Sequence, residues 1–119
     1  MRECVNCHGP LQAARLSCPA CGLSFEGTFY MPRLARLDPD QQQLAEQLIL
    51  AAGNLKDVAA ALDVSYPTLR KRLDTLIVAL RDLRAADETQ ISEFLRAVEA
   101  GTMTAETAAR LIRELHGQS

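Results

Sequence analysis

The sequence predicts a mostly α-helical protein with a small β module at its N-terminus. Apolar residues recur at helical spacing from Leu44 onward, and residues that cap helices precede each of these stripes. Near the N-terminus, four cysteines stand instead in two closely spaced pairs among short apolar segments. We therefore expect four parts, which are a β module at 1–30, a linker at 31–37, a helical domain at 38–86 and a helical hairpin at 87–119.

The composition excludes several classes of protein. Apolar residues make up 48% of the chain and charged residues 24%, and no apolar run approaches the ~18 residues that a membrane span requires. The N-terminus lacks the apolar stretch of a signal peptide, so we expect a cytoplasmic protein without a membrane partner. The net charge of −2 excludes a globally basic nucleic-acid binder. Residues 65–86 nevertheless hold five bases against two acids, which is compatible with a local basic strip.

The two cysteine pairs predict a metal site. Cys4 and Cys7 form one Cys-x-x-Cys pair, Cys18 and Cys21 form the other, and ten residues separate them. A two-residue gap lets both sulfurs of a pair face one ion at about 2.3 Å, and four thiolates in a closed tetrahedral site favour zinc. Disulfides and free core thiols are the alternatives, and neither suits a cytoplasmic chain with this spacing. We predict one structural Zn²⁺ per chain.

The surroundings of the cysteines favour a zinc ribbon. Short candidate strands at 11–17 and 23–30 flank the second pair, and Glu26-Gly27 is a turn signal within the latter. Because such a small module buries little apolar surface, metal binding should supply much of its folding energy. The Cys-Pro-x-Cys-Gly segment also resembles that of the iron-binding rubredoxins. Rubredoxins have a longer separation between the pairs and an aromatic-rich core, both of which are missing here.

Three successive helices are predicted after the linker. Asp38 and Gln41 form a capping box with Pro39 at the first helical position, and the stripe that follows ends at Gly53. Asn54 caps a second helix, which stops near Asp63-Val64, and Ser65 caps a third. Two short helices joined by a tight turn, with alanines where the backbones cross, indicate a helix-turn-helix.

Residues 53–73 resemble a Fis-type helix-turn-helix, with its Gly-Asn start, Ala-rich first helix and Thr-Leu-Arg-Lys-Arg-Leu segment. The sequence departs from that family at Tyr66, where Arg is frequent, and at Asp63, where Gly is usual in the turn. Asp74 also lies on the outward face. The resemblance implies double-stranded DNA as the partner. The residues assigned to the DNA-facing side are Ser65, Tyr66, Thr68, Arg70 and Lys71, with Arg72 flanking the inward stripe.

A leucine seam extends the third helix. Its members are Leu69, Leu73, Leu76, Leu80 and Leu83, at heptad spacing, and they predict that the helix continues to about Ala85. Either the seam packs against the protein's own C-terminal helices, or Leu76, Leu80 and Leu83 form a homodimer interface that places two recognition helices for a two-fold site.

The C-terminal part is expected to be a hairpin of two amphipathic helices. A second capping box begins at Asp87 and predicts a new helix there, and Gly101 and Thr104 predict a turn followed by a last helix. Such a hairpin does not stay folded alone, so it must pack on the long helix or on a partner.

Residues 1–85 resemble a bacterial family of uncharacterised proteins that join a zinc ribbon to a helix-turn-helix, which carries a domain-of-unknown-function label. No Ser/His/Asp arrangement or phosphate-binding loop occurs, and a four-cysteine zinc site has no open position for chemistry, so we expect neither an enzyme nor a small-molecule substrate. The leading hypothesis is a dimeric DNA-binding transcriptional regulator. The alternatives are a protein-interaction adaptor that recognises partners through the ribbon or the hairpin, and, third, a rubredoxin-like electron carrier.

Overall fold

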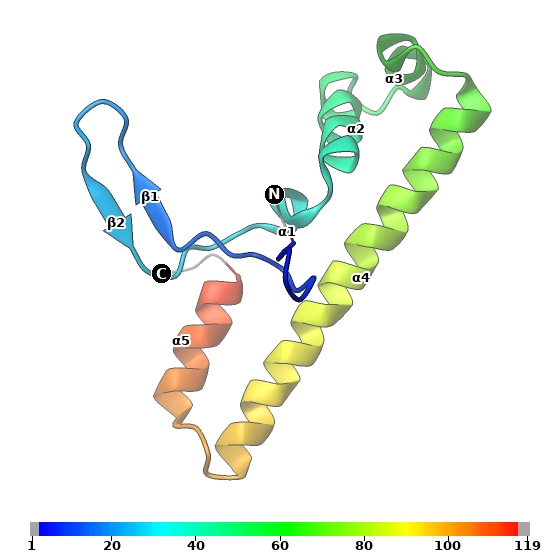
Figure 1. The fold of residues 1–119 in the computed structure, drawn as a ribbon. Coiled ribbons are helices and arrows are strands. Elements are labelled where there is room, and N and C mark those ends of the chain that lie inside the picture. Colours follow the sequence, from blue (N-terminus) through cyan, green and yellow to red (C-terminus); the bar gives the residue numbers. More distant parts are fainter. Residues whose placement is uncertain (1–2, 117–119) are drawn as a thin grey trace. The chain divides into compact units, whose positions relative to one another are not determined.

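The computed structural model describes residues 3–116, which form a two-stranded sheet and five helices. The first two residues of the predicted ribbon and the last three of the predicted hairpin lie outside the described residues. The protein is mostly helical with a small antiparallel sheet near its N-terminus, as the sequence predicts (Figure 1). Contacts divide the chain into two compact units between Met31 and Pro32.

The N-terminal unit is built around a short β-hairpin. Strand β1 (Arg15–Ser17) pairs antiparallel with β2 (Ser24–Glu26), and Leu16 lies opposite Phe25. The strands are shorter than predicted because only three residue pairs are in register, although the Gly27 amide still donates to the Ala14 carbonyl at 3.0 Å. The loop between the strands carries the second cysteine pair, and the first pair lies inside a second turn closed by a bridge between Glu3 and Pro10.

The helical unit begins with a feature that differs from the prediction. The expected linker at 31–37 contains a short helix, α1 (Arg33–Arg36). Leu37, the last residue of that predicted linker, is buried in the helical core. The side-chain amide of Gln42 fixes this segment, because its Nε2 donates to the carbonyls of Ala35 and Leu37, at 2.9 Å each. Residues 33–37 are therefore part of the helical unit.

The next two helices begin where capping residues predict. Helix α2 (Pro39–Leu50) starts with the capping box, in which the Gln41 amide donates to Asp38 Oδ1 at 2.8 Å. Helix α3 (Leu55–Leu62) starts at Asn54, whose side-chain oxygen accepts from the Lys56 amide at 3.1 Å. They pack against the first half of α4 (Tyr66–Glu99) (Figure 1). The buried core consists of Leu37, Leu44, Val58, Ala59, Leu69 and Leu76.

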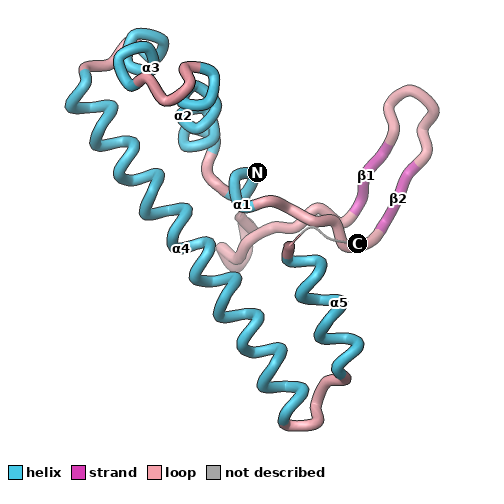
Figure 2. Tube along the Cα trace, turned by 180° about the vertical axis from the view of Figure 1, so that it is seen from behind, coloured by secondary structure: helices cyan, strands magenta, loops and turns pink. Residues whose placement is uncertain are grey.

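The expected helix end near Ala85 and new start at Asp87 are wrong. Helix α4 continues without interruption through both positions to Glu99, as Figure 2 shows from behind. No glycine or proline interrupts residues 68–99, and Ala85 and Ala86 favour a helix. The Thr89 hydroxyl donates to the Ala85 carbonyl at 3.0 Å, a bond that is compatible with an unbroken helix.

The C-terminal hairpin consists of the end of α4 and helix α5 (Ala105–Leu115). Gly101 makes the turn with φ of +76°, and the Thr104 hydroxyl caps α5 by accepting from the Thr107 amide at 3.1 Å. Within residues 3–116, none of the helices is both long and apolar enough to cross a lipid bilayer.

Candidate nucleic-acid interface and cysteine pairs

Helices α3 and the start of α4 form a helix-turn-helix. Val58 and Leu69, one from each helix, are completely buried, and Ala59 is buried beside them. The turn between the helices passes through Asp63, which has the left-handed backbone conformation with φ of 53°. This conformation explains why glycine is usual at this position in the resembled family, because glycine adopts it without steric cost.

All six residues of the predicted DNA interface, the flanking Arg72 included, are exposed at the N-terminal end of α4 and its cap. Their side chains are nevertheless engaged in different ways. The Ser65 hydroxyl caps the helix, since it accepts from the Thr68 amide at 3.4 Å and donates to the Thr68 hydroxyl at 2.9 Å. Two of the six side chains thus form a local cap, and their hydroxyl groups are already satisfied by each other.

The basic side chains differ in their surroundings. Arg70 lies 3.7 Å from the Asp74 carboxylate one turn later, and both side chains are more than half exposed. Arg72 lines a recess beside the start of α2, together with Asp38 and Asp40. Among the described residues, Lys71 has no ion pair. Lys71 and Arg70 therefore offer exposed positive charge on this surface, whereas Arg72 shares its recess with two carboxylates of the protein itself.

The leucine seam lies within the protein. Leu76 is 3% exposed in the core, and Leu80 and Leu83 are half-buried against the same core. The seam is thus covered within the chain, but by the helices that precede it and not by the C-terminal helices that the sequence offered as the alternative to a dimer. Leu76 has no surface left to offer a second copy. Three earlier helices, α1, α2 and α3, contact α4.

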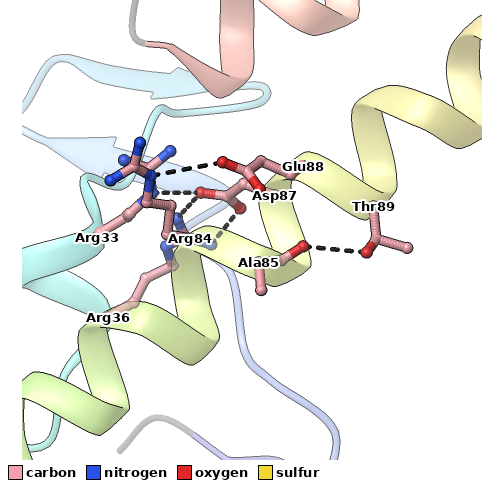
Figure 3. A network of polar contacts seen from close by, with 7 residues as sticks. All are labelled: Arg33, Arg36, Arg84, Ala85, Asp87, Glu88 and Thr89. Atoms are coloured by element: carbon pink, nitrogen blue, oxygen red, sulfur yellow. Dashed lines mark hydrogen bonds and ion pairs between the residues drawn. The ribbon is translucent and has the colours of Figure 1, made fainter.

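Asp87 has a role that the sequence prediction missed. It is 3% exposed in the middle of α4, and the Arg33 Nε donates to its Oδ2 at 2.8 Å. Arg36 binds the same carboxylate with two nitrogens, at 3.0 Å to Oδ1 and 2.6 Å to Oδ2 (Figure 3). We call these three residues the Asp87 clamp. Its sequence signal is the Arg-x-x-Arg spacing in the predicted linker, which places both guanidinium groups on one side of a helical turn.

The clamp keeps the Asp87 carboxyl ionised. The hydrogen bonds from Arg36 hold the pKa of Asp87 below its usual value, and those from Arg33 add to this effect, whereas burial acts in the opposite direction. A bidentate arginine contact supplies both charge and fixed geometry, so the clamp anchors α1 to the middle of α4.

The two cysteine pairs have the same local structure. The His8 amide donates to the Cys4 carbonyl at 2.9 Å, and the Gly22 amide donates to the Cys18 carbonyl at 2.8 Å. His8 and Gly22 both have positive φ, at 60° and 78°. Gly9 acts differently, because a Cβ there would lie 3.3 Å from the Cys7 sulfur, closer than an ordinary van der Waals contact. Each pair thus forms a tight turn with its two sulfurs exposed or half-exposed.

Backbone amides favour a thiolate at the first cysteine of each pair. Hydrogen bonds from Cys7 and Asn6 lower the pKa of Cys4, and bonds from Cys21 and Ala20 lower the pKa of Cys18. All four cysteines carry free thiols. Within residues 3–116, no three His, Cys, Asp or Glu side chains come together as a group that could hold a metal ion. The described part of the chain therefore contains two separate turns, each with two thiols.

Comparison with known proteins bears on the helical unit. Residues 37–82 match a family described as "Domain of unknown function (DUF2089)-HTH". The match covers α2, α3 and the first half of α4, so the chain contains an uncharacterised domain with a helix-turn-helix. Neither a curated protein nor a solved structure matches the chain.

Proposed function

We propose that this protein is a cytoplasmic, dimeric transcriptional regulator that binds double-stranded DNA through the start of α4. The observation that carries the proposal is the exposed basic surface at the N-terminal end of α4, supported from behind by α3 in helix-turn-helix geometry. A rigid, well-packed support is what allows a recognition helix to enter the major groove in a fixed register. The match to a helix-turn-helix domain supports the same assignment.

The contacts divide the six predicted residues by role. Lys71 and Arg70 bind phosphates, and Arg70 exchanges its surface pair with Asp74 for the stronger charge of the DNA backbone. Tyr66, which is 51% exposed near the start of the helix, faces the groove. Ser65 and Thr68 hold the helix start in shape. Arg72 contributes less to DNA binding, because the recess that it lines also holds the carboxylates of Asp38 and Asp40.

A structural zinc ion is the second part of the proposal. Cys4, Cys7, Cys18 and Cys21 would hold one Zn²⁺ per chain, and the lowered pKa values of Cys4 and Cys18 support thiolate ligation. Four thiolates at one ion require the two turns to meet. When bound, such an ion supplies folding energy rather than catalysis, because four protein ligands leave no open coordination position.

An adaptor that recognises a protein remains the second candidate function, and one observation favours it. Leu34, Ile49 and Leu50 are 49%, 71% and 73% exposed and line a shallow groove between α1 and α2. An apolar groove on a helical unit is suited to a helix of another protein. The adaptor hypothesis predicts that a partner co-purifies and that the protein has no affinity for DNA.

Salt-dependent DNA binding distinguishes the two functions. Binding of a labelled duplex of random sequence is measured by fluorescence anisotropy between about 50 and 200 mM salt. The test variant is Arg70→Ala/Lys71→Ala. The matched control is Arg110→Ala/Arg113→Ala, which removes two arginines of α5 that are also exposed.

The proposal expects affinity that falls steeply with salt in the wild type and in the control. In the test variant, the slope of log affinity against log salt should decrease by about 2, one for each lost phosphate contact. Arg72→Ala should change that slope much less. Absence of binding at the lowest salt, or equal losses in the test variant and the control, would exclude the proposed interface.

A further inference from the structure

One recess on the helical unit carries opposite charges that do not pair with each other. It has a volume of about 350 Å³ and is lined by residues from the start of α2, the end of α3 and the first part of α4. We call it the Arg72 recess, and its lining includes Asp38, Asp40, Leu44, Leu62, Arg72 and Thr75. Its volume lies within the range of about 300–1,000 Å³ that is usual for small-molecule sites.

The positive and negative sides of the recess come from different helices. Arg72 lies on α4, and Asp40 lies in the first turn of α2. Asp38 is committed in part, because its Oδ1 accepts from the Gln41 amide at 2.8 Å to cap α2. In the described part of the chain, Arg72 makes an ion pair with neither carboxylate, and the Asp40 carboxylate has no hydrogen bond. The Arg72 guanidinium and the Asp40 carboxylate are thus both available to a ligand.

Part of the lining is apolar. Leu44 belongs to the buried core and is 5% exposed, and Leu62, the last residue of α3, is half-buried. A bridging ion would satisfy charge but leave this apolar surface in contact with water. An aliphatic group placed against the two leucines would instead gain the free energy of apolar burial. The recess therefore combines a cation, carboxylates and an apolar wall, which is the complement of a small zwitterion with a hydrocarbon side chain.

We propose that the Arg72 recess binds a free α-amino acid that has an aliphatic side chain. The carboxylate of the ligand pairs with the Arg72 guanidinium, its ammonium group pairs with the Asp40 carboxylate, and its side chain packs on Leu44 and Leu62. A zwitterion meets both signs of charge at once, which neither an anion nor a cation does. The inference goes beyond the proposed function, because neither Arg70 nor Lys71 lines the recess and its test requires no DNA.

The test is a titration of the full chain followed by amide NMR. The first probe is L-leucine, and two analogues each lack one of its charges: isoamylamine has no carboxylate, and isocaproate has no ammonium group. Magnesium chloride and sodium phosphate examine whether the recess binds a simple ion instead. These comparisons use the unmodified protein, so their outcome does not depend on the folding of a variant.

Two substitutions remove one charge from each side of the recess. Arg72→Gln removes the guanidinium, and Asp40→Asn removes the carboxylate at nearly constant size. The matched control for the first is Arg81→Gln, at an exposed arginine of α4 outside the lining. The matched control for the second is Asp57→Asn, at an exposed acid that also lies in the first turn of its helix.

The expected result is saturable binding of L-leucine that shifts the amides of 40–44 and 72–75. The dissociation constant should be about 1 mM or lower, as is typical for a ligand of this size. Each analogue should bind about tenfold more weakly, because it lacks one charged hydrogen-bonding group. Arg72→Gln should weaken L-leucine by a similar factor without affecting isoamylamine. Asp40→Asn should weaken L-leucine without affecting isocaproate, and both control variants should bind as the wild type does.

Three outcomes would overturn the inference. The first is no saturation by L-leucine up to about 20 mM, well above the expected dissociation constant. The second is equal affinity for L-leucine and either analogue, and the third is an equal loss in a recess variant and its control. Shifts caused by magnesium or phosphate but not by L-leucine would assign the recess to a simple ion. The proposed DNA interface is tested separately by Arg70→Ala/Lys71→Ala, so its failure is distinguishable from failure of this ligand site.

Discussion

The N-terminal unit, which we propose to be a zinc ribbon, and the helical unit are stabilised in different ways. The helical unit buries six apolar side chains in one cluster, and Leu37, Val58 and Leu69 are at most 2% exposed. In residues 3–31, by contrast, not one side chain is buried, and Leu16 and Phe25, which face each other across the strands, are 50% and 57% exposed. The helical unit therefore owes its fold to apolar burial, whereas the ribbon has to obtain its stability from another source.

The two units also use backbone hydrogen bonds differently. In the ribbon, the described bonds concentrate in the two cysteine turns, where they orient sulfur atoms. In the helical unit, side-chain caps begin the helices, and the Asp87 clamp fixes α1 to α4. The difference indicates that removal of a cysteine and removal of a buried contact should affect separate parts of the chain.

The largest expected effect is the loss of the ribbon fold on removal of a cysteine. Cys18→Ser should abolish zinc binding and unfold residues 3–31, because metal binding to zinc fingers is worth about 10–16 kcal/mol and the ribbon has no buried core to replace it. The measurement is metal content together with the amide NMR spectrum. Thermal unfolding of the helices should be unchanged.

The matched control for the ribbon is Ser24→Ala. It removes the hydroxyl that contacts Ser17 at 3.1 Å on the exposed side of the hairpin and leaves all four thiols in place, so zinc content should stay at one ion per chain. Ribbon signals that survive Cys18→Ser without metal would contradict the zinc proposal. A red, iron-loaded protein that undergoes reversible reduction would instead support the rubredoxin-like alternative.

A smaller effect is expected in the helical unit from loss of the Asp87 clamp. Asp87→Asn should lower the free energy of unfolding by about 2 kcal/mol, less than the 3–5 kcal/mol of a fully buried pair because both arginines are partly exposed. Denaturant unfolding measures the change. The control is Glu88→Gln, which breaks a pair with Arg84 at 3.4 Å in which both side chains are mostly exposed, and which should change stability by less than about 0.5 kcal/mol.

The clamp also predicts a dependence on pH. Because the folded-state pKa of Asp87 is lowered, its stabilisation is complete above the unfolded-state value of about 3.9 and is lost as the pH falls through the folded-state pKa. The stability difference between wild type and Asp87→Asn should therefore be constant near neutral pH and shrink in acid. A difference that grows below about pH 4 would contradict the clamp.

Local signals made most of the helical unit predictable from the sequence. The residues Asp38, Asn54, Ser65 and Thr104 were expected to cap helices, and each side chain does so, because capping depends only on the next three residues. The same reasoning failed at Asp87. Its capping-box pattern is genuine in sequence, but arginines more than 50 residues away bind the carboxylate, and the surrounding residues favour helix.

The candidate sites were predictable to a lesser degree. Helical periodicity correctly placed Lys71 on the surface and Leu69 in the core. Helical periodicity could not predict the surroundings of Arg72, which lies between the exposed face and the core face of α4. Those surroundings depend on where the start of α2 packs. Periodicity also could not show that Leu76 is covered by the chain itself, because a heptad stripe is the same whether its partner is internal or a second copy.

The smallest expected effect, and the one that connects stability with DNA binding, is at the turn of the helix-turn-helix. Asp63 has φ of 53°, so Asp63→Gly should raise the free energy of unfolding by about 0.5–1 kcal/mol through relief of left-handed strain. It also removes an acid two residues before Ser65, so affinity for DNA should increase modestly. Asp63→Asn separates the two effects, because asparagine removes the charge but keeps a side chain at positive φ. We expect Asn to reproduce the gain in DNA affinity with little of the gain in stability. If Asp63→Gly stabilises the fold while neither substitution strengthens DNA binding, the turn does not lie near phosphates, and the docking of α4 on DNA must be revised.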